Sequence, residues 1–346
     1  MKTTVDAREP MSFEEDVLDL ALESLQARHE SEPGRARPTR RSRRRTAIAI
    51  AAAGLAIAIA IAIPIALPGG ATGGADPAAA AVLHRVALRA AQQPPEPAPG
   101  PGQYLYTRSE SASTFLYVVG EGTTFMFMQP SVDQSWTGPD GSGRILHTSG
   151  AATFPTDADR AKWIAAGSPD LYENATEDEF FGPDDLWYAD YADLPTDPEE
   201  LLNLIERREI VGVGGPNGDW ETFVIIGDLL RGTYTSPEVR AALYQVAADL
   251  PGVELVGRVV DGAGRPGVAV AYTNMNSDAP SRMELIFDPR TAELLGSNEV
   301  LVADSTVEVE SAWPGTIYGA VGPAGTHTFT TSYLVSGVVD STDERR

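Results

Sequence analysis

One segment limits what this chain can be more than any other. Residues Ala47 to Leu67 carry no charge and consist of alanine, isoleucine, leucine and glycine with one late proline, Pro64. A helix rises 1.5 Å per residue, so the segment spans about 30 Å, the thickness of the hydrocarbon core of a bilayer. It therefore predicts a single transmembrane helix.

Charges on either side of the span predict its orientation. A basic linker comes directly before it, and no basic residue follows until Arg85. Because basic loops stay on the cytoplasmic side, we expect a cytoplasmic N-terminus and a C-terminal part outside the plasma membrane. The linker also favours contact with anionic lipid head groups. The arginines that carry the topology signal are Arg40, Arg41, Arg43, Arg44 and Arg45.

Two other interpretations of the hydrophobic segment fit less well. A cleaved signal peptide has a shorter charged region and a shorter apolar core than this sequence. A twin-arginine signal is suggested by Arg40 and Arg41, but Ser42 and Arg43 stand where such signals usually continue with apolar residues. The sequence thus predicts a cytoplasmic tail (1–46), a transmembrane helix (47–67), a spacer (68–77) and an extracytoplasmic domain (78–346).

The cytoplasmic tail contains one amphipathic pattern. Ser12 and Glu15 have the spacing of a capping box, and the helix that they start should run to about Glu30. One interpretation is that this helix binds a groove on a cytoplasmic protein. The other is a marginal helix that lies at the membrane surface or frays in solution. The apolar stripe that would contact a partner is Val17, Leu18, Ala21, Leu22 and Leu25.

Charge and composition exclude several functions for the outer part. Residues 1–46 hold ten basic and nine acidic residues, which leaves 16 basic and 40 acidic residues for the remainder. A surface this acidic repels phosphate backbones, so we expect no nucleic acid as a partner. The chain has no cysteine, its histidines are widely separated, and no hydrolase, nucleotide-binding or metal-binding motif is present. We therefore expect no catalytic residues, no metal, no cofactor and no enzyme activity.

The outer part alternates between strand and helix patterns. Strand patterns come first, helical and acidic segments follow, and strand patterns return near the C-terminus, which predicts an α+β fold with helices packed on a curved antiparallel sheet. The expected helices are 76–92, 158–166, 196–205, 219–230 and 236–250. The expected strands are 103–108, 114–119, 123–128, 134–138, 144–148, 253–260, 267–273, 282–287, 293–295, 298–304, 306–312 and 327–339.

One stretch of the outer part mixes carboxylates with aromatic side chains, between Glu177 and Asp193. The aromatic side chains predict an apolar ligand groove. Two alternatives stay open: the carboxylates could hold a divalent cation, or the stretch is a solvated acidic loop whose aromatics anchor it to the core. The groove residues are Phe180, Phe181, Trp187, Tyr188 and Tyr191.

Several short segments in a fixed order carry a family resemblance. After the basic run and the span these are Ala81–Arg85, Pro99–Tyr106, Leu194–Pro198, Leu229–Leu230, Pro237–Tyr244, Leu250–Val253, Gly264–Ala269 and Phe287–Pro289. Together they resemble an uncharacterised actinobacterial family of single-pass membrane proteins that are often encoded beside extracytoplasmic-function sigma factors. The resemblance covers roughly residues 78–300, and residues 1–46 match it least.

The resemblance carries expectations about function. The outer domain is similar to the lipoprotein-carrier fold, which periplasmic regulators of sigma-factor signalling also use, with helices against the concave side of a sheet. It implies a membrane-anchored sensor or regulator, with a cytoplasmic sigma factor as the candidate partner of the tail helix, in the manner of an anti-sigma factor. The alternative is a module that binds an envelope lipid or lipoprotein, with the span as a simple anchor.

Overall fold

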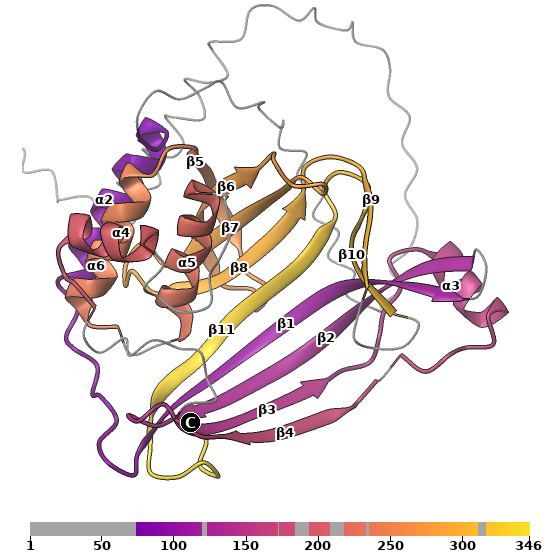
Figure 1. Ribbon diagram of the computed structural model, residues 1–346, viewed down its shortest axis with the longest axis horizontal. Coiled ribbons are helices and arrows are strands. Elements are labelled where there is room, and N and C mark those ends of the chain that lie inside the picture. Colours follow the sequence, from indigo (N-terminus) through magenta and orange to yellow (C-terminus); the bar gives the residue numbers. More distant parts are fainter. Residues whose placement is uncertain are drawn as a thin grey trace, which may run out of the picture.

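The strands of the outer part form a single antiparallel sheet. The computed structural model describes residues 74–119, 123–171, 173–183, 194–207, 218–232, 235–310 and 316–346. Nine strands follow the order β4-β3-β2-β1-β11-β8-β7-β6-β5, and a β9–β10 ribbon joins the sheet through β1 (Figure 1). The strands are β1 (Tyr104–Val119), β2 (Thr123–Thr137), β3 (Gly143–Ser149), β4 (Thr176–Phe181), β5 (Val253–Val260), β6 (Pro266–Asn274), β7 (Ser281–Phe287), β8 (Leu294–Leu301), β9 (Ser305–Glu310), β10 (Thr316–Gly322) and β11 (His327–Val339).

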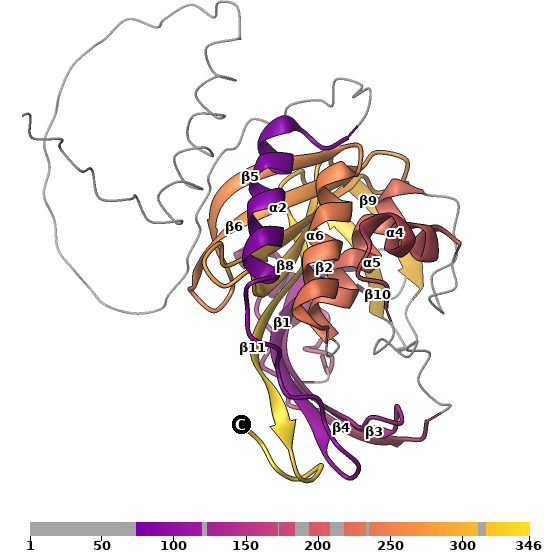
Figure 2. The ribbon, with the colours of Figure 1, turned by 90° about the vertical axis from the view of Figure 1, so that its left-hand side faces the viewer.

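Four helices pack on one half of this sheet, and a fifth lies far from them beside the β1–β2 ribbon (Figures 1 and 2). Their starts agree with the sequence signals, because Asp76, Asp197 and Ser236 accept hydrogen bonds from the first free amides of their helices. In each of these three helices a proline follows the cap. The helices are α2 (Pro77–Ala90), α3 (Asp157–Ala165), α4 (Pro198–Glu206), α5 (Asp219–Gly232) and α6 (Pro237–Asp249).

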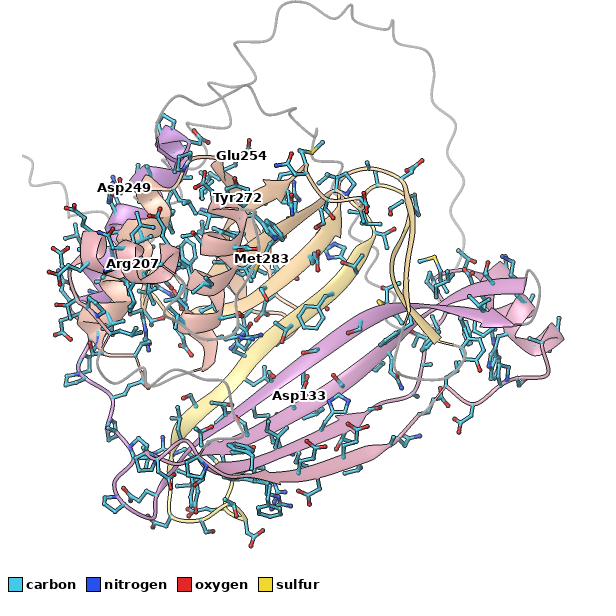
Figure 3. All side chains as sticks on the ribbon, in the orientation of Figure 1. Asp133, Arg207, Asp249, Glu254, Tyr272 and Met283 are labelled. Carbon is cyan, nitrogen blue, oxygen red and sulfur yellow. The ribbon has the colours of Figure 1, made fainter. Side chains whose placement is uncertain are left out.

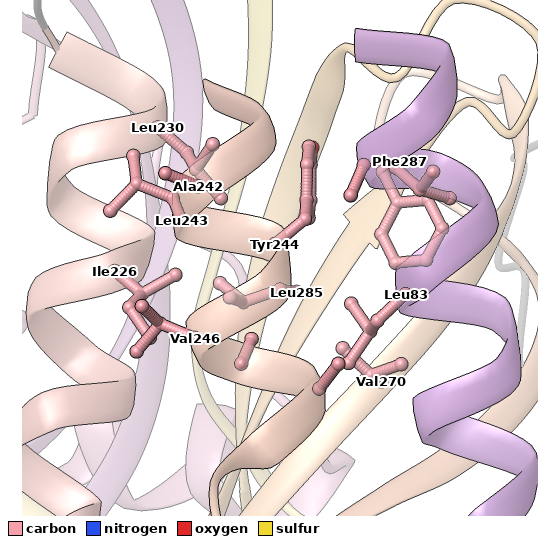
Figure 4. Close-up of a cluster of buried hydrophobic side chains, with 14 of the residues drawn as sticks. Leu83, Ile226, Leu230, Ala242, Leu243, Tyr244, Val246, Val270, Leu285 and Phe287 are labelled. Atoms are coloured by element: carbon pink, nitrogen blue, oxygen red, sulfur yellow. The ribbon is translucent and has the colours of Figure 1, made fainter. Parts of the chain in front are cut away.

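The main hydrophobic core lies between the helices and strands β5 to β8. Leu83 of α2 and Leu243 of α6 are fully buried there, and Phe287 of β7 packs edge-on against Tyr244 (Figure 4). The Tyr244 hydroxyl donates a hydrogen bond to the carbonyl oxygen of Ala292 at 2.8 Å, and burial raises the pKa of Tyr244. This half of the molecule confirms the expected α+β class, with helices packed on an antiparallel sheet.

The long strands differ from the sequence prediction. Residues 103–108 and 114–119 were expected as separate strands, and so were 123–128 and 134–138, but the structure joins each pair into one strand, β1 and β2. The joining residues of β1, 109–113, alternate serine with Glu110 and Ala112, so they have no apolar alternation. They extend because they pair with β2 on one side and β11 on the other, where the Ser111 hydroxyl donates to the Thr331 hydroxyl at 2.9 Å.

Three further strand assignments need correction. The two strands expected at 293–295 and 298–304 are replaced by the single strand β8, which ends at Leu301, and β10 is an additional strand. Residues 176–181 lie in the region where the sequence predicts helical and acidic segments, but they form the edge strand β4. Charged side chains suit an edge strand because they oppose pairing with other chains, and this composition hides the strand from a periodicity argument.

The predicted membrane segment lies outside the described residues, and so do the cytoplasmic tail with its stripe and the five arginines of the topology signal. Among the helices of the described ranges, none has the length and apolar character needed to cross a bilayer.

Candidate functional site

The sheet has two faces, which the strand register distinguishes. We call the face that carries the helices the inner face, and the opposite one the outer face. Leu285 belongs to the core under the helices and lies opposite Ser297, which in turn lies opposite Thr331. Thr331 lies opposite Ser111, which lies opposite Ser131. Because paired residues point to the same side, these side chains extend the inner face beyond the helices.

Along the middle of the long strands, from Thr107 to Ser113 of β1, the inner face is polar and lined by small side chains, whereas Phe115, Phe125 and Phe127 form an apolar cluster at one end of the same face. Figures 1 and 2 show α2, α4, α5 and α6 over the β5–β8 half, away from β2 and β3. The area that these helices leave uncovered presents hydroxyls, most of them half-buried, and Thr331 at its border is buried. These residues, which we call the hydroxyl face, are Thr107, Ser109, Ser111, Ser113, Ser131, Ser135 and Thr331.

An acid–histidine pair lies within the hydroxyl face. Asp133 of β2 and His147 of β3 are register partners, and their Oδ1 and Nδ1 atoms are 2.6 Å apart (Asp133 is labelled in Figure 3). Glu177 of β4 is the register partner of His147 on the other side. Ser131 donates a hydrogen bond to Asp133 Oδ2 at 3.4 Å, so its hydroxyl is engaged by the carboxylate. The pair provides donors and acceptors that are fixed in position, as a polar ligand requires.

The border between the helices and the hydroxyl face is also polar. Asp228 and Arg231 of α5 form an ion pair at 2.9 Å. The Tyr333 hydroxyl of β11 is 3.4 Å from the Ser297 hydroxyl, and burial raises the pKa of Tyr333. Burial also raises the pKa of Asp228, which the positive charge of Arg231 opposes. The helical layer thus contacts the edge of the hydroxyl face through polar groups.

Sequence reasoning missed the Asp133–His147 pair. His147 was read as isolated because its partner is 14 residues away in the sequence. The sequence does contain a signal: Asp140 to Gly143, between the expected strands 134–138 and 144–148, is typical of a hairpin turn, and this hairpin places residue 133 opposite residue 147.

The predicted aromatic groove is only partly within the described residues. Phe180 and Phe181 are neighbours in β4, so their rings point to opposite faces of the sheet and do not line one groove together. Phe180 is 69% exposed on the outer face, and Phe181 is half-buried on the inner face. Trp187, Tyr188 and Tyr191 lie outside the described ranges. Within those ranges no group of three or more histidine, aspartate and glutamate side chains could hold a metal ion.

A second cluster lies on the outer face, at the end of the long strands. Trp136 of β2 is fully buried. Its ring centroid lies 5.2 Å from the ring centroid of Tyr106 and also 5.2 Å from the guanidinium carbon of Arg144. Arg144 of β3 donates two hydrogen bonds of 2.8 Å to the two carboxylate oxygens of Asp178 in β4. The same guanidinium lies 5.3 Å from the Phe180 ring centroid. We call Gln134, Trp136, Arg144 and Phe180 the arginine–aromatic site.

The ion pair between Arg144 and Asp178 predicts how the stability of the fold depends on pH. Hydrogen bonding from Arg144 holds the pKa of Asp178 below its ordinary value. A carboxyl whose pKa is depressed on folding stabilises the fold above its unfolded pKa, about 3.9, and this stability is lost as pH falls through the depressed value. We expect Asp178→Asn to lower the unfolding temperature at pH 7, and the difference from the unmodified chain to shrink only as pH falls below about 4 and through the depressed pKa. Thermal unfolding from pH 7 to pH 2 measures this.

The neighbouring Glu179 provides the control for that measurement, because it points to the inner face, away from Arg144. Glu179→Gln should change the unfolding temperature at pH 7 less than Asp178→Asn does. Equal effects from both variants, or an Asp178→Asn difference that does not shrink at all between pH 7 and pH 2, would contradict the assignment.

Comparisons with known proteins leave the family of this chain open. No family model matches the sequence, and no curated protein matches it. Among solved structures, the chain is similar to one in the complex structure of Pseudomonas aeruginosa MucA/MucB, with 14% identity and a TM-score of 0.21. The match covers 76% of this chain and 58% of that one, less than two thirds of its length. A TM-score this low carries no argument about fold or function, so the actinobacterial resemblance stays a prediction.

Proposed function

We propose that this chain is a single-pass regulatory protein of the plasma membrane, whose outer domain binds a polar envelope ligand and whose cytoplasmic helix binds a protein partner. The observation that carries the ligand-binding part is the open hydroxyl face with its Asp133–His147 pair. The cytoplasmic part rests on the amphipathic pattern of residues 12–30, and a sigma factor is its candidate partner. Activity as an enzyme is not part of the proposal.

The chemistry of the hydroxyl face favours one class of ligand. Serine and threonine hydroxyls form hydrogen bonds, whereas an acyl chain is held by apolar side chains. The excess of acidic over basic residues in the outer part disfavours phosphate and other strong anions. We therefore propose a neutral or cationic ligand with many hydrogen-bonding groups. The alternative, a lipid or lipoprotein module, would place its acyl chain elsewhere in the domain.

The contacts of the residues that follow the spacer support a link between ligand binding in the outer domain and the predicted membrane span. After the spacer, the Asp76 amide donates a hydrogen bond to the Val253 carbonyl of β5 at 2.8 Å, and Asp76 then caps α2. One side of α2 is buried in the main core, against α6 and β5. A change at the hydroxyl face that shifts the helical layer would therefore reach the segment that continues into the predicted span.

The cytoplasmic part is tested by capture from native membranes. Full-length protein is isolated and its bound proteins are identified by mass spectrometry, in parallel with Leu18→Glu/Leu22→Glu on the predicted stripe. The matched control is Asp16→Asn/Asp19→Asn, which alters the polar side of the same helix. We expect a sigma factor with the unmodified chain and the control, and its loss with the stripe variant. If the stripe variant loses no partner, the regulatory proposal fails.

The outer part is tested by filling the hydroxyl face. Ser131→Leu places an apolar side chain on this face, and Val132→Leu is a control of matched size on the outer face of the same strand. We expect Ser131→Leu to change the host transcripts that the stripe variant also changes, and Val132→Leu to leave them unaltered. A lipid that co-purifies with the domain in native mass spectrometry, together with no effect of Ser131→Leu, would favour the alternative.

A further inference from the structure

The arginine–aromatic site on the outer face is occupied by the chain's own last residues. Arg144 Nη1 donates hydrogen bonds to the Thr342 carbonyl oxygen at 3.0 Å and to Asp343 Oδ1 at 2.9 Å. Trp136 Nε1 donates one to the Glu344 carbonyl oxygen at 2.6 Å. The segment thus presents two main-chain carbonyls and one carboxylate to this site. The segment forms a turn, in which the Glu344 amide donates a hydrogen bond to the Ser341 carbonyl oxygen at 3.3 Å, and it is bound to the site mainly by polar contacts.

The site is organised independently of that segment. Asp178 accepts hydrogen bonds from Nε and Nη2 along one edge of the Arg144 guanidinium, and the Trp136 and Phe180 rings lie against it, so the orientation of Nη1 is fixed without the segment. Tyr106 donates a hydrogen bond to Gln134 Oε1 at 3.0 Å, which fixes the next side chain along β2. A pre-organised site loses little conformational entropy when it binds.

The bound segment is, by contrast, weakly buried. All residues from 341 to 346 are exposed except the half-buried Thr342, and the Asp343 side chain is 89% exposed. Arg345 stacks on the Trp136 ring at 5.5 Å and donates to Gln134 Oε1 at 2.8 Å. A few exposed hydrogen bonds and one cation–π contact hold the segment, and interactions of this kind exchange readily with a competitor.

We propose that residues 341–344 are a displaceable internal ligand, and that the arginine–aromatic site recognises a turn-forming peptide of a partner protein with an acidic residue between two available main-chain carbonyls. The acidic residue pairs with Arg144 as Asp343 does, and the carbonyls accept from Arg144 and Trp136. This site lies on the face opposite the hydroxyl face, so it gives the domain a second surface for a protein partner. Displacement also uncovers the Trp136 indole, which the segment now covers.

The test uses the full-length chain in mild detergent and a fluorescent peptide with the sequence of residues 340–346, blocked at both ends. Binding is measured by fluorescence anisotropy with the intact chain and with a chain that ends at Asp340. We expect the shortened chain to bind the peptide at least about tenfold more tightly than the intact chain, whose own segment competes. A peptide carrying Asp343→Asn should bind the shortened chain about tenfold more weakly, because a charge-assisted hydrogen bond is lost.

Two further variants keep the result interpretable. Arg144→Lys in the shortened chain keeps the charge but loses the planar fork, and it should abolish most of the peptide binding. Asp343→Asn in the intact chain, which keeps its full length, should bind the unmodified peptide more tightly than the intact original does. No binding by a shortened chain that melts normally, or equal binding by intact and shortened chains, would overturn the proposal. If the shortened chain does not fold, the intact Asp343→Asn comparison decides.

Discussion

Replacing Leu243 with alanine is expected to lower the free energy of unfolding by about 3–4 kcal/mol. Leu243 is 0% exposed in the middle of α6, and Figure 4 shows it beside Leu230 of α5. The substitution removes buried methyl groups and leaves a cavity where two helices and the sheet meet, so the transfer and cavity contributions add. Thermal unfolding of the full chain in detergent should show a fall of roughly 10 °C.

The same substitution at Leu88 is the control. Leu88 is 65% exposed on α2, so Leu88→Ala should change the stability by less than about 0.5 kcal/mol. If the two variants unfold at similar temperatures, the helices do not form the core described here. A large effect of Leu88→Ala alone would mean instead that the exposed side of α2 is covered in the intact protein.

Replacing Gly296 with alanine is expected to weaken the connection between the two halves of the sheet, at a cost of about 3 kcal/mol. Gly296 lies in β8 opposite Ser332 of β11, where the long strands meet the helix-covered half. A Cβ atom at this position would lie only 2.3 Å from the Thr331 carbonyl oxygen, which belongs to the main chain and cannot turn aside. We expect faster hydrogen exchange at the β8–β11 amides together with a lower unfolding temperature.

Gly100→Ala is the matched control for Gly296→Ala, because it makes the same substitution at a position away from the β8–β11 contact. Its Cβ would meet only the end of the flexible Gln103 side chain, at 3.3 Å, so the expected change is small. Similar exchange rates at β8 and β11 in Gly296→Ala and Gly100→Ala would show that the two halves do not depend on this contact.

The helical half of the fold could be predicted from the sequence because its signals are local. A cap at Asp197 or Ser236, a proline after it and an apolar stripe are all contained within one helix. The β5–β6 and β7–β8 hairpins were also predicted, since apolar strands flank short turns. These elements bury one face each, and burial leaves a periodic pattern.

The long strands and the candidate sites could not be predicted in the same way. The middle of β1 satisfies its polar side chains through β2 and β11, and β11 lies more than 200 residues away in the sequence. Asp133 and His147 meet only through strand register, and residues 342–344 reach Arg144 and Trp136, about 200 residues away in the sequence, only through the fold. Contacts between residues so far apart produce no periodic pattern in the sequence. The sequence therefore points to the aromatic stretch around Phe180, whose residues are close together in the chain, as the candidate site.

The central claim is that the folded domain and the amphipathic helix lie on opposite sides of one membrane, and the absence of cysteine from the chain allows a direct test. Single cysteines are introduced by Ser31→Cys in the basic linker and by Asp278→Cys in the exposed loop between β6 and β7. Intact cells are then treated with a membrane-impermeant maleimide. We predict labelling of Asp278→Cys in intact cells, and of Ser31→Cys only after lysis. Labelling of Ser31→Cys in intact cells, or of Asp278→Cys only after lysis, would contradict the account.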